Sequence, residues 1–296
     1  GSNTVAMFRI DPRDPSRLTM VGRPVPSKGE FPISVAINSE GNMVCVLNGG
    51  KVNGISCFTA HPIFGLISKP NTSRSLGLKQ TTPPSGPPGS ASHIIFSADD
   101  SRVMASVKGI PPTPGFIASW AITADGSLAA EPVKSTPASG GLLPFSMTLI
   151  PGTHGVLSTD PGIGFEIYNF GSGQNQNSKA SSSVVTIPGQ KATCWSTYSS
   201  KSGNFYLIDA GTATITEVHV DGNFKGKIVK QYPQVSGSAT IDAEVATIEN
   251  NNYLYVLAAN AASINVLSVN IPGKATTVQN FSFASAAKAA GIKFGM

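Results

Sequence analysis

Two short segments carry side chains that can transfer protons at neutral pH. His93 ends the segment GSASH, and an imidazole titrates near neutrality, so His93 can act as a general base or acid. Asp242 and Glu244 lie two apart in ATIDAEVATI, which places both carboxylates on one face of an extended strand. We therefore predict His93, Asp242 and Glu244 as catalytic residues. Two alternatives stay open: a histidine packed between sheets, and carboxylates that accept backbone N–H groups.

Small hydroxyl side chains recur where the first strand of each repeat is expected to start. They leave room for a ligand, so we predict ligand-binding roles for Ser34, Ser92, Ser146 and Thr193. The sequence contains no HExxH, CxxC, His-x-His, GxSxG or GxxxxGK[ST] motif. It therefore predicts no bound metal and no cofactor.

Three charged residues follow second strands of the repeats. Asp160 in STDPG and Asp209 in LIDAG occupy equivalent places, and aspartates there are expected to cap turns. Lys108 in ASVKG is a fixed cation at the corresponding exit, where a lysine is expected to be solvated.

The elements that position these side chains come from a repeat. FSADDSRVMASVKG at 96–109 has an apolar end, a polar turn, an apolar strand and a small or glycine exit. Segments of the same shape start at residues 37, 149, 198 and 247, so the starts lie 49 to 59 residues apart. Repeats of this length with several short strands indicate a solenoid or a propeller.

Each repeat divides into four short strands. In the unit beginning near Phe31, the expected strands are FPISVAIN, MVCVLN, GISCFTAHP and LISKPNTSRSL, with the outermost most polar. The sequence thus predicts an all-β propeller of four-stranded antiparallel blades, as one domain over residues 1–296. GSNTVAMFRIDP and LTMVGRPVP match third and fourth strands, so the chain is expected to start mid-blade and to hold about five and a half blades.

The composition narrows the class of partner. The 296 residues are 40% hydrophobic and only 12% charged, with 31 glycines and 22 prolines, as in chains with many short strands. The net charge of +5 comes from singly scattered lysines, so we predict no nucleic-acid partner. No apolar run reaches about 18 residues, so we predict no membrane association.

The cysteines and sequons bear on the compartment. Cys45 and Cys57 lie symmetrically about GGKVNG and can form a disulfide as cross-strand neighbours; the alternative is two small strand residues. Asn71 and Asn280 begin N-glycosylation triplets. Together they favour a secreted or cell-wall protein, with a cytoplasmic one as the alternative.

The segments GSNTVAMFRIDP, INSEGNMVCVLNGG with GISCF, and FSADDSRVMASVKG resemble a family of fungal lactonase-type propellers. These are 3-carboxymuconate cyclase-like proteins related to 6-phosphogluconolactonases. The resemblance implies seven blades, with about one and a half blades before Gly1. The family's Pro-His-Ala-His-like segment is reduced here to GSASH, with one histidine.

Two functions follow as hypotheses. The first is a lactonase or lactonizing enzyme, a hydrolase or isomerase, acting on a small carboxylated lactone in the central channel. The second is a secreted propeller without catalysis that binds a protein or a glycan. An anionic substrate would meet Asp242 and Glu244 with no matching arginine, which weakens the cyclase hypothesis.

Overall fold

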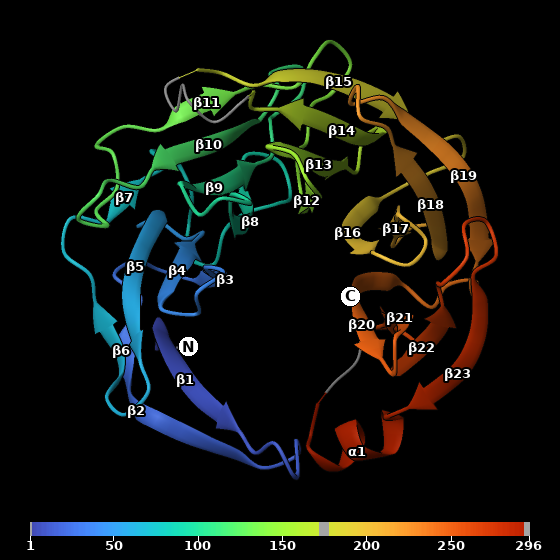
Figure 1. The fold of residues 1–296 in the computed structure, drawn as a ribbon, viewed down its shortest axis with the longest axis horizontal. Coiled ribbons are helices and arrows are strands. Elements are labelled where there is room, and N and C mark those ends of the chain that lie inside the picture. The colour runs from blue at the N-terminus through green and yellow to red at the C-terminus, as the bar shows by residue number, and fades with distance from the viewer. Residues whose placement is uncertain (1, 172–177, 293–296) are drawn as a thin grey trace. The chain divides into compact units, whose positions relative to one another are not determined.

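The computed structural model describes residues 2–171 and 178–292, which form strands β1–β23 and helix α1 (Figure 1). The chain divides into two compact units. The first comprises residues 1–136 and 171–179, and the second comprises residues 137–170 and 180–296.

The first unit contains three antiparallel sheets. A two-stranded sheet pairs β1 (Thr4–Ile10) with β2 (Leu18–Pro26). The second sheet has the order β3–β4–β5–β6, and β7 also pairs with β5; the bounds are β3 (Pro32–Ile37), β4 (Met43–Asn48), β5 (Gly54–His61), β6 (Gly65–Ser68) and β7 (Arg74–Ser75). The third has the order β8–β9–β10–β11; the bounds are β8 (Ala91–Phe96), β9 (Arg102–Val107), β10 (Phe116–Ala121) and β11 (Val133–Ser135).

The second unit contains three four-stranded antiparallel sheets, each ordered as in the sequence. One consists of β12 (Met147–Ile150), β13 (Gly155–Asp160), β14 (Gly164–Asn169) and β15 (Ser181–Thr186). The next consists of β16 (Thr193–Ser199), β17 (Asn204–Asp209), β18 (Thr214–Val220) and β19 (Gly226–Pro233). The last consists of β20 (Thr240–Ile248), β21 (Asn251–Ala258), β22 (Ser263–Ser268) and β23 (Thr276–Ser282), and α1 (Ala284–Ala289) follows it.

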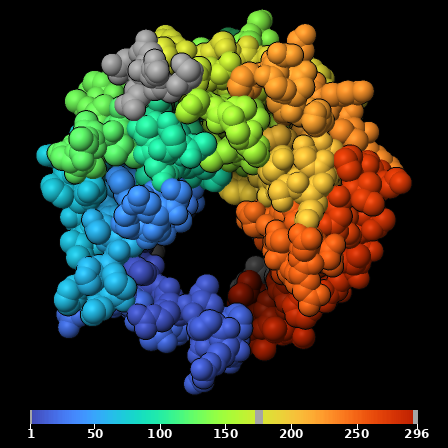
Figure 2. Space-filling model, in the orientation of Figure 1, coloured from blue at the N-terminus to red at the C-terminus, as the bar shows by residue number. Residues whose placement is uncertain are grey.

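Burial is complete in four of the second strands and is lost in the outer strand β23. Every residue of β4, β9, β13 and β17 is buried, whereas every residue of β23 is exposed. A second strand is apolar on both faces because strands flank its edges and other sheets cover its faces. Within each unit the sheets follow the chain as successive blocks of surface (Figure 2).

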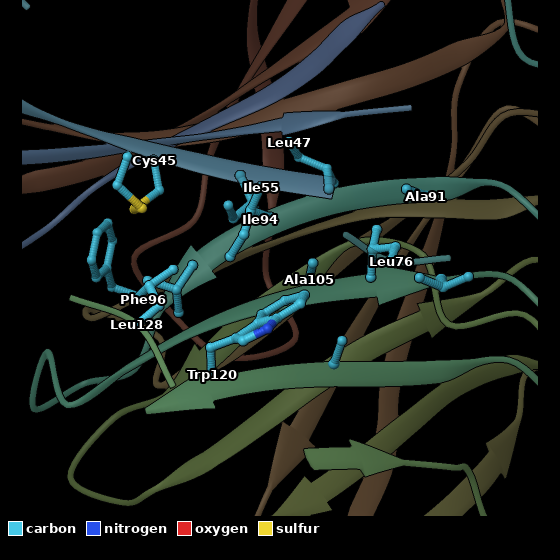
Figure 3. Packing of buried hydrophobic residues seen from close by; sticks show 14 of the residues in the cluster. Cys45, Leu47, Ile55, Leu76, Ala91, Ile94, Phe96, Ala105, Trp120 and Leu128 are labelled. Carbon is cyan, nitrogen blue, oxygen red and sulfur yellow. A yellow bond between two sulfur atoms is a disulfide. The ribbon is translucent and has the colours of Figure 1, made fainter. Parts of the chain in front are cut away.

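Hydrophobic clusters join neighbouring sheets within a unit. In the first unit, Leu47 and Ile55 of one sheet pack with Ile94, Ala105 and Trp120 of the next (Figure 3). In the second unit, separate clusters join the β12–β15 sheet to the β16–β19 sheet, and that sheet to the β20–β23 sheet. First strands of adjacent sheets therefore lie side by side, β3 with β8, β12 with β16, and β16 with β20.

A disulfide joins β4 and β5. Cys45 and Cys57 are cross-strand partners with Cα atoms 4.1 Å apart, and both are fully buried. Cys194 is a free thiol whose burial raises its pKa to about 11, so the reactive thiolate is scarce at neutral pH.

The prediction of four-stranded antiparallel units is confirmed, and five such sheets are described. β2, β4, β18 and β23 have the predicted bounds. The predicted fourth strand at 127–135 is wrong in length, because only Val133–Ser135 pairs with β10. Seven blades and the single domain stay predictions. No helix in the described part of the chain is long and apolar enough to span a membrane.

Candidate functional site

Four of the five first strands in the described blades have an irregularity near their starts, and β12 has none. The pairing register shifts in β3 between Pro32 and Ser34, in β8 between Ala91 and Ile94, in β16 between Thr193 and Trp195, and in β20 between Thr240 and Asp242. Such shifts redirect side chains and are frequent beside active sites. Ser92 and His93 lie inside the shift in β8, so their side chains are freed from the regular alternation of the strand.

Lys108 contacts Ser92 across the β8–β9 pair. Its Nζ donates a hydrogen bond to Ser92 Oγ and lies 3.5 Å from the carbonyl oxygen of Ala91. Lys108 is only 4% exposed, so the prediction of a solvated lysine is wrong. Burial lowers the pKa of its ammonium to about 8, close enough to neutrality for the free amine to form.

Lys108 comes directly after the last residue of β9, whereas in two other sheets the last residue of the second strand is a capping aspartate. Asp160 Oδ2 accepts the N–H groups of Leu142 and Leu143 at 2.7 and 2.9 Å. Asp209 caps in the same way and accepts the N–H groups of Lys191, Ala192, Gly211 and Thr212. The predicted capping roles are confirmed. In the β8–β11 sheet Val107 holds the equivalent pairing position, and the buried cation Lys108 follows it.

His93 is half-buried and follows Ser92 in β8. Its backbone N–H donates to Ser106 Oγ at 3.2 Å. Burial lowers the pKa of the ring to about 4, so the imidazole is neutral at neutral pH. A neutral ring cannot serve as the proton donor that the sequence suggested, and it is a weaker base than an ordinary histidine.

Burial of His93 predicts acid sensitivity. Its folded pKa of about 4 lies below the ordinary 6.5, so the unfolded chain binds the proton first and stability falls as the pH drops between these values. The shift corresponds to about 3 kcal/mol. Denaturant unfolding at about pH 7.5 and about pH 4.5 should show that His93→Gln loses less stability than the native protein by roughly this amount. Equal losses would contradict a buried neutral ring.

A cavity of about 570 Å³ adjoins Lys108. Residues 77–80, Gly89 and 107–116 line it, with Ile110, Pro112 and Phe116 among the apolar side chains. Its lining contains Lys79 and Lys108 and no carboxylate among the described residues. A volume of this order suits a small organic ligand.

Ser34 is half-buried at the edge between two first strands. Its Oγ accepts the N–H of Ile94 at 3.2 Å, so it ties β3 to β8. Because this hydroxyl can still donate, its ligand-binding role stays a prediction.

Asp242 and Glu244 are exposed on β20 in the second unit. Glu244 Oε1 accepts from Thr197 Oγ1 at 3.1 Å and from the Val245 N–H at 3.0 Å, and Asp242 Oδ1 accepts the Ala243 N–H at 2.8 Å. Partial burial and, less strongly, the charge of Glu244 raise the pKa of Asp242. The raised pKa improves Asp242 as a base. Ser92 and His93 belong to the first unit, whereas Asp242 and Glu244 belong to the second. Each pair is therefore a separate candidate site.

Two predicted ligand-binding residues have structural roles. Ser146 is fully buried, and its Oγ lies 3.3 Å from Ser196 Oγ. Thr193 is 1% exposed, and its N–H and hydroxyl both bond Gln190 Oε1 at 3.1 Å. The expectation of open space at these two hydroxyls is corrected, because protein atoms already surround them.

No group of three or more histidine, cysteine or acidic side chains within the described ranges could hold a metal ion. The sequence reasoning missed the contact of Lys108 with Ser92. No sequence signal reveals this contact, because Lys108 comes one position after Val107, the residue that corresponds to Asp160 and Asp209.

Comparisons with known proteins identify the fold. No protein-family model and no curated protein matches this chain. The chain is similar to a periplasmic gluconolactonase of Pseudomonas aeruginosa, at 15% identity and a TM-score of 0.68 over 95% of this chain and 80% of that one. It is also similar to a proposed 6-phosphogluconolactonase of Bacteroides uniformis, at 14% identity and a TM-score of 0.72 over 93% and 78%.

A third likeness is to a chain in a nidogen–laminin complex, at 12% identity and a TM-score of 0.57 over 95% of this chain and 90% of that one. Identities this low establish the fold alone. The chain has the all-β propeller fold of these proteins, with four-stranded antiparallel blades, five of which the described residues contain.

Proposed function

We propose that this protein is a lactonase-type hydrolase that opens a small cyclic ester, with Ser92 as nucleophile and Lys108 as general base. The observation that carries the proposal is the hydrogen bond between Lys108 Nζ and Ser92 Oγ at the start of a first strand. A serine activated by a lysine is an established variant of the serine–histidine–aspartate arrangement. The similarity to a gluconolactonase adds support through the shared fold.

The reaction needs Lys108 as the free amine. Lys108 takes the proton of the Ser92 hydroxyl while Ser92 Oγ attacks the lactone carbonyl. The bond between the carbonyl carbon and the ring oxygen then breaks, and the Lys108 ammonium returns the proton to the leaving alkoxide. Water, deprotonated by Lys108, hydrolyses the acyl-serine and releases a hydroxy acid. Lys108 serves as the base in both steps and gives up its proton at the end of each. One water molecule is consumed over the whole reaction, so the protons balance.

The cavity beside Lys108 suggests the substrate class. Its apolar walls at Ile110, Pro112 and Phe116 suit a small ring, and Lys79 supplies a positive charge at the lining. The described residues of the lining include no carboxylate, so no negative charge in it repels an anion. A small carboxylated lactone fits this chemistry.

The pH dependence of turnover tests the proposal. Because burial sets the pKa of Lys108 to about 8, kcat/KM should rise about tenfold per pH unit below that value and level off above it. Rates must be corrected for spontaneous lactone hydrolysis at each pH. A flat profile between about pH 6 and about pH 9 would contradict Lys108 as the base.

Asp242 offers a different base, which could activate water directly from the second unit. Its raised pKa and its neighbour Glu244 support this alternative. Asp242→Asn separates the two assignments: turnover should persist in this variant if Ser92 and Lys108 form the site, and it should collapse if Asp242 is the base.

Binding of a protein partner is the second candidate function. The β1–β2 sheet carries the exposed cross-strand pairs Phe8 with Met20 and Ile10 with Leu18, each side chain between 46% and 61% exposed. An exposed apolar face of this kind suits contact with a protein partner. Absence of turnover on a lactone panel, with loss of partner binding in Phe8→Asp, would favour this function.

We also propose an extracytoplasmic location. The buried disulfide between Cys45 and Cys57 supports an oxidising compartment, and the sequon asparagines, Asn71 and Asn280, are both exposed.

A further inference from the structure

A second cavity, of about 400 Å³, lies in the first unit. Three stretches line it: the β2–β3 connection at Lys28 and Gly29, the β4–β5 turn from Asn48 to Ile55, and the segment around β7 from Ser73 to Leu78. We propose that this cavity is a binding site for a small hydroxycarboxylate, held by Lys28, Lys51 and Arg74 and read at its hydroxyl by Asn48. The inference does not depend on the proposed hydrolase activity.

The charge of the cavity favours an anion. Lys28, Lys51 and Arg74 all line it, and no carboxylate lines it among the described residues. The sequence does not reveal this cluster, because successive cations in it are 23 residues apart. Converging cations raise the local concentration of anionic ligands and bind carboxylates.

Arg74 is fixed in place by backbone carbonyl groups. Its Nε donates to Ala129 at 2.7 Å, one terminal nitrogen donates to Ser73 at 2.8 Å, and the other donates to Leu128. These neutral acceptors use three of the five guanidinium N–H groups and leave the charge uncompensated. A held guanidinium loses little conformational freedom when an anion binds.

The nearest acid by sequence and backbone pairing is Glu30, whose N–H donates to the Val52 carbonyl. The carboxylate of Glu30 accepts a hydrogen bond from the hydroxyl of Thr82, and Glu30 does not line the cavity. The positive charge of the lining is therefore not cancelled by an acid within it.

Asn48 gives the second, independent observation. It is 1% exposed and lies against Gly29, where an added Cβ would come within 2.6 Å of its side chain. Its Nδ2 donates to the Ser27 carbonyl at 3.1 Å, but Oδ1 is buried and accepts no hydrogen bond. A buried acceptor without a donor costs stability, so a ligand hydroxyl that donates to Oδ1 gains more than an ordinary contact.

Comparison with the equivalent positions sharpens this point. Asp160 and Asp209 end the second strands of their sheets, and their carboxylates accept hydrogen bonds from backbone N–H groups of the adjoining loops. Asn48 ends β4 at the same place, and no loop N–H reaches its oxygen. In the three sheets without the capping aspartate, the second strands end at Asn48, Val107 and Ala258. Asn48 lines one cavity, and Lys108, which follows Val107, lines another.

Cations and a donor-seeking oxygen together define the ligand class. The cations favour a ligand with a carboxylate, and Asn48 Oδ1 can accept a hydrogen bond from a hydroxyl next to that carboxylate. Malate has two carboxylates and one hydroxyl, and succinate is the same diacid without the hydroxyl. The pair therefore separates binding by charge from recognition of the hydroxyl.

Isothermal titration of the native protein with each acid is the test. We expect malate to bind about tenfold more tightly than succinate, because succinate leaves Oδ1 unsatisfied. Lys51→Gln should weaken both acids, since Lys51 is exposed and its loss removes charge without disturbing the core. Lys274→Gln, which changes the net charge equally at a distance in the chain, should change neither.

Asn48→Leu should abolish the preference for malate and retain weak binding of both acids, provided that circular dichroism shows a folded protein. If that variant does not fold, the comparison of malate and succinate with Lys51→Gln still decides. Equal affinities for the two acids would overturn recognition of the hydroxyl by Asn48. Binding of neither acid at millimolar concentration, or no loss in Lys51→Gln, would overturn the site, whatever the lactone assays show.

Discussion

Lys108→Met should lower the rate of lactone hydrolysis by about 10²–10⁴-fold, the usual contribution of a positioned general base. The ammonium nitrogen that contacts Ser92 Oγ is removed, while the methionine chain still fills the buried space of a residue that is 4% exposed. Ser92→Ala should cost as much, because the pair acts as one unit. The double variant should therefore be no slower than either single variant.

Lys79→Met is the matched control, since Lys79 lines the same cavity but is exposed. It should raise KM for a carboxylated lactone and leave kcat nearly unchanged, because it contributes charge to binding and no proton transfer. A kcat loss in Lys79→Met as large as that in Lys108→Met would show that charge in the cavity, and not a base at Ser92, limits turnover.

Loss of the Cys45–Cys57 disulfide should destabilise the first unit by about 3 kcal/mol, from the entropy of a loop of this length. The chain has two tryptophans, and Trp120 lies in the first unit while Trp195 lies in the second. In a Trp195→Phe background, the fluorescence of Trp120 reports unfolding of the first unit alone. Denaturant midpoints should fall when Cys45 and Cys57 are both changed to alanine, or when reductant is added to the native pair.

Reductant should have no effect on the double alanine variant, and Cys194→Ala should respond to it as the native protein does. Alkylation under denaturing conditions should modify one thiol, Cys194, before reduction and three after it. Three reactive thiols in the protein as isolated would contradict the bond.

Strand positions could be predicted from the sequence because each strand has a local signal. Apolar runs such as MVCVLN and TITEVHV end at turns, and the structure places β4 and β18 over these residues. The strand predicted at 127–135 is longer than β11. SLAAEPVKS mixes apolar and polar residues, but only its last three residues pair with a neighbouring strand. Pairing depends on a partner strand, which the segment itself does not reveal.

The candidate site could be predicted only in part. Ser92 and His93 were found because they stand out at a strand start, but a lysine looks the same in sequence whether it reaches solvent or folds back. Lys108 lies beside a cavity whose lining includes residues 77–80, which are distant from it in sequence. The open space expected at Ser146 and Thr193 is occupied by Ser196, which is distant in sequence, and by Gln190, which is three residues away.

Acylation by a β-lactone tests the central claim most directly, because the probe is itself a strained cyclic ester. Peptide mass spectrometry after brief exposure should find the acyl group on Ser92, at a rate that rises as the pH approaches the pKa of Lys108, about 8. The same measurement on Lys108→Met should find little or no acylated Ser92. Lactone turnover by the native protein without acylation of Ser92, or equal acylation in Lys108→Met, would contradict a serine nucleophile activated by this lysine.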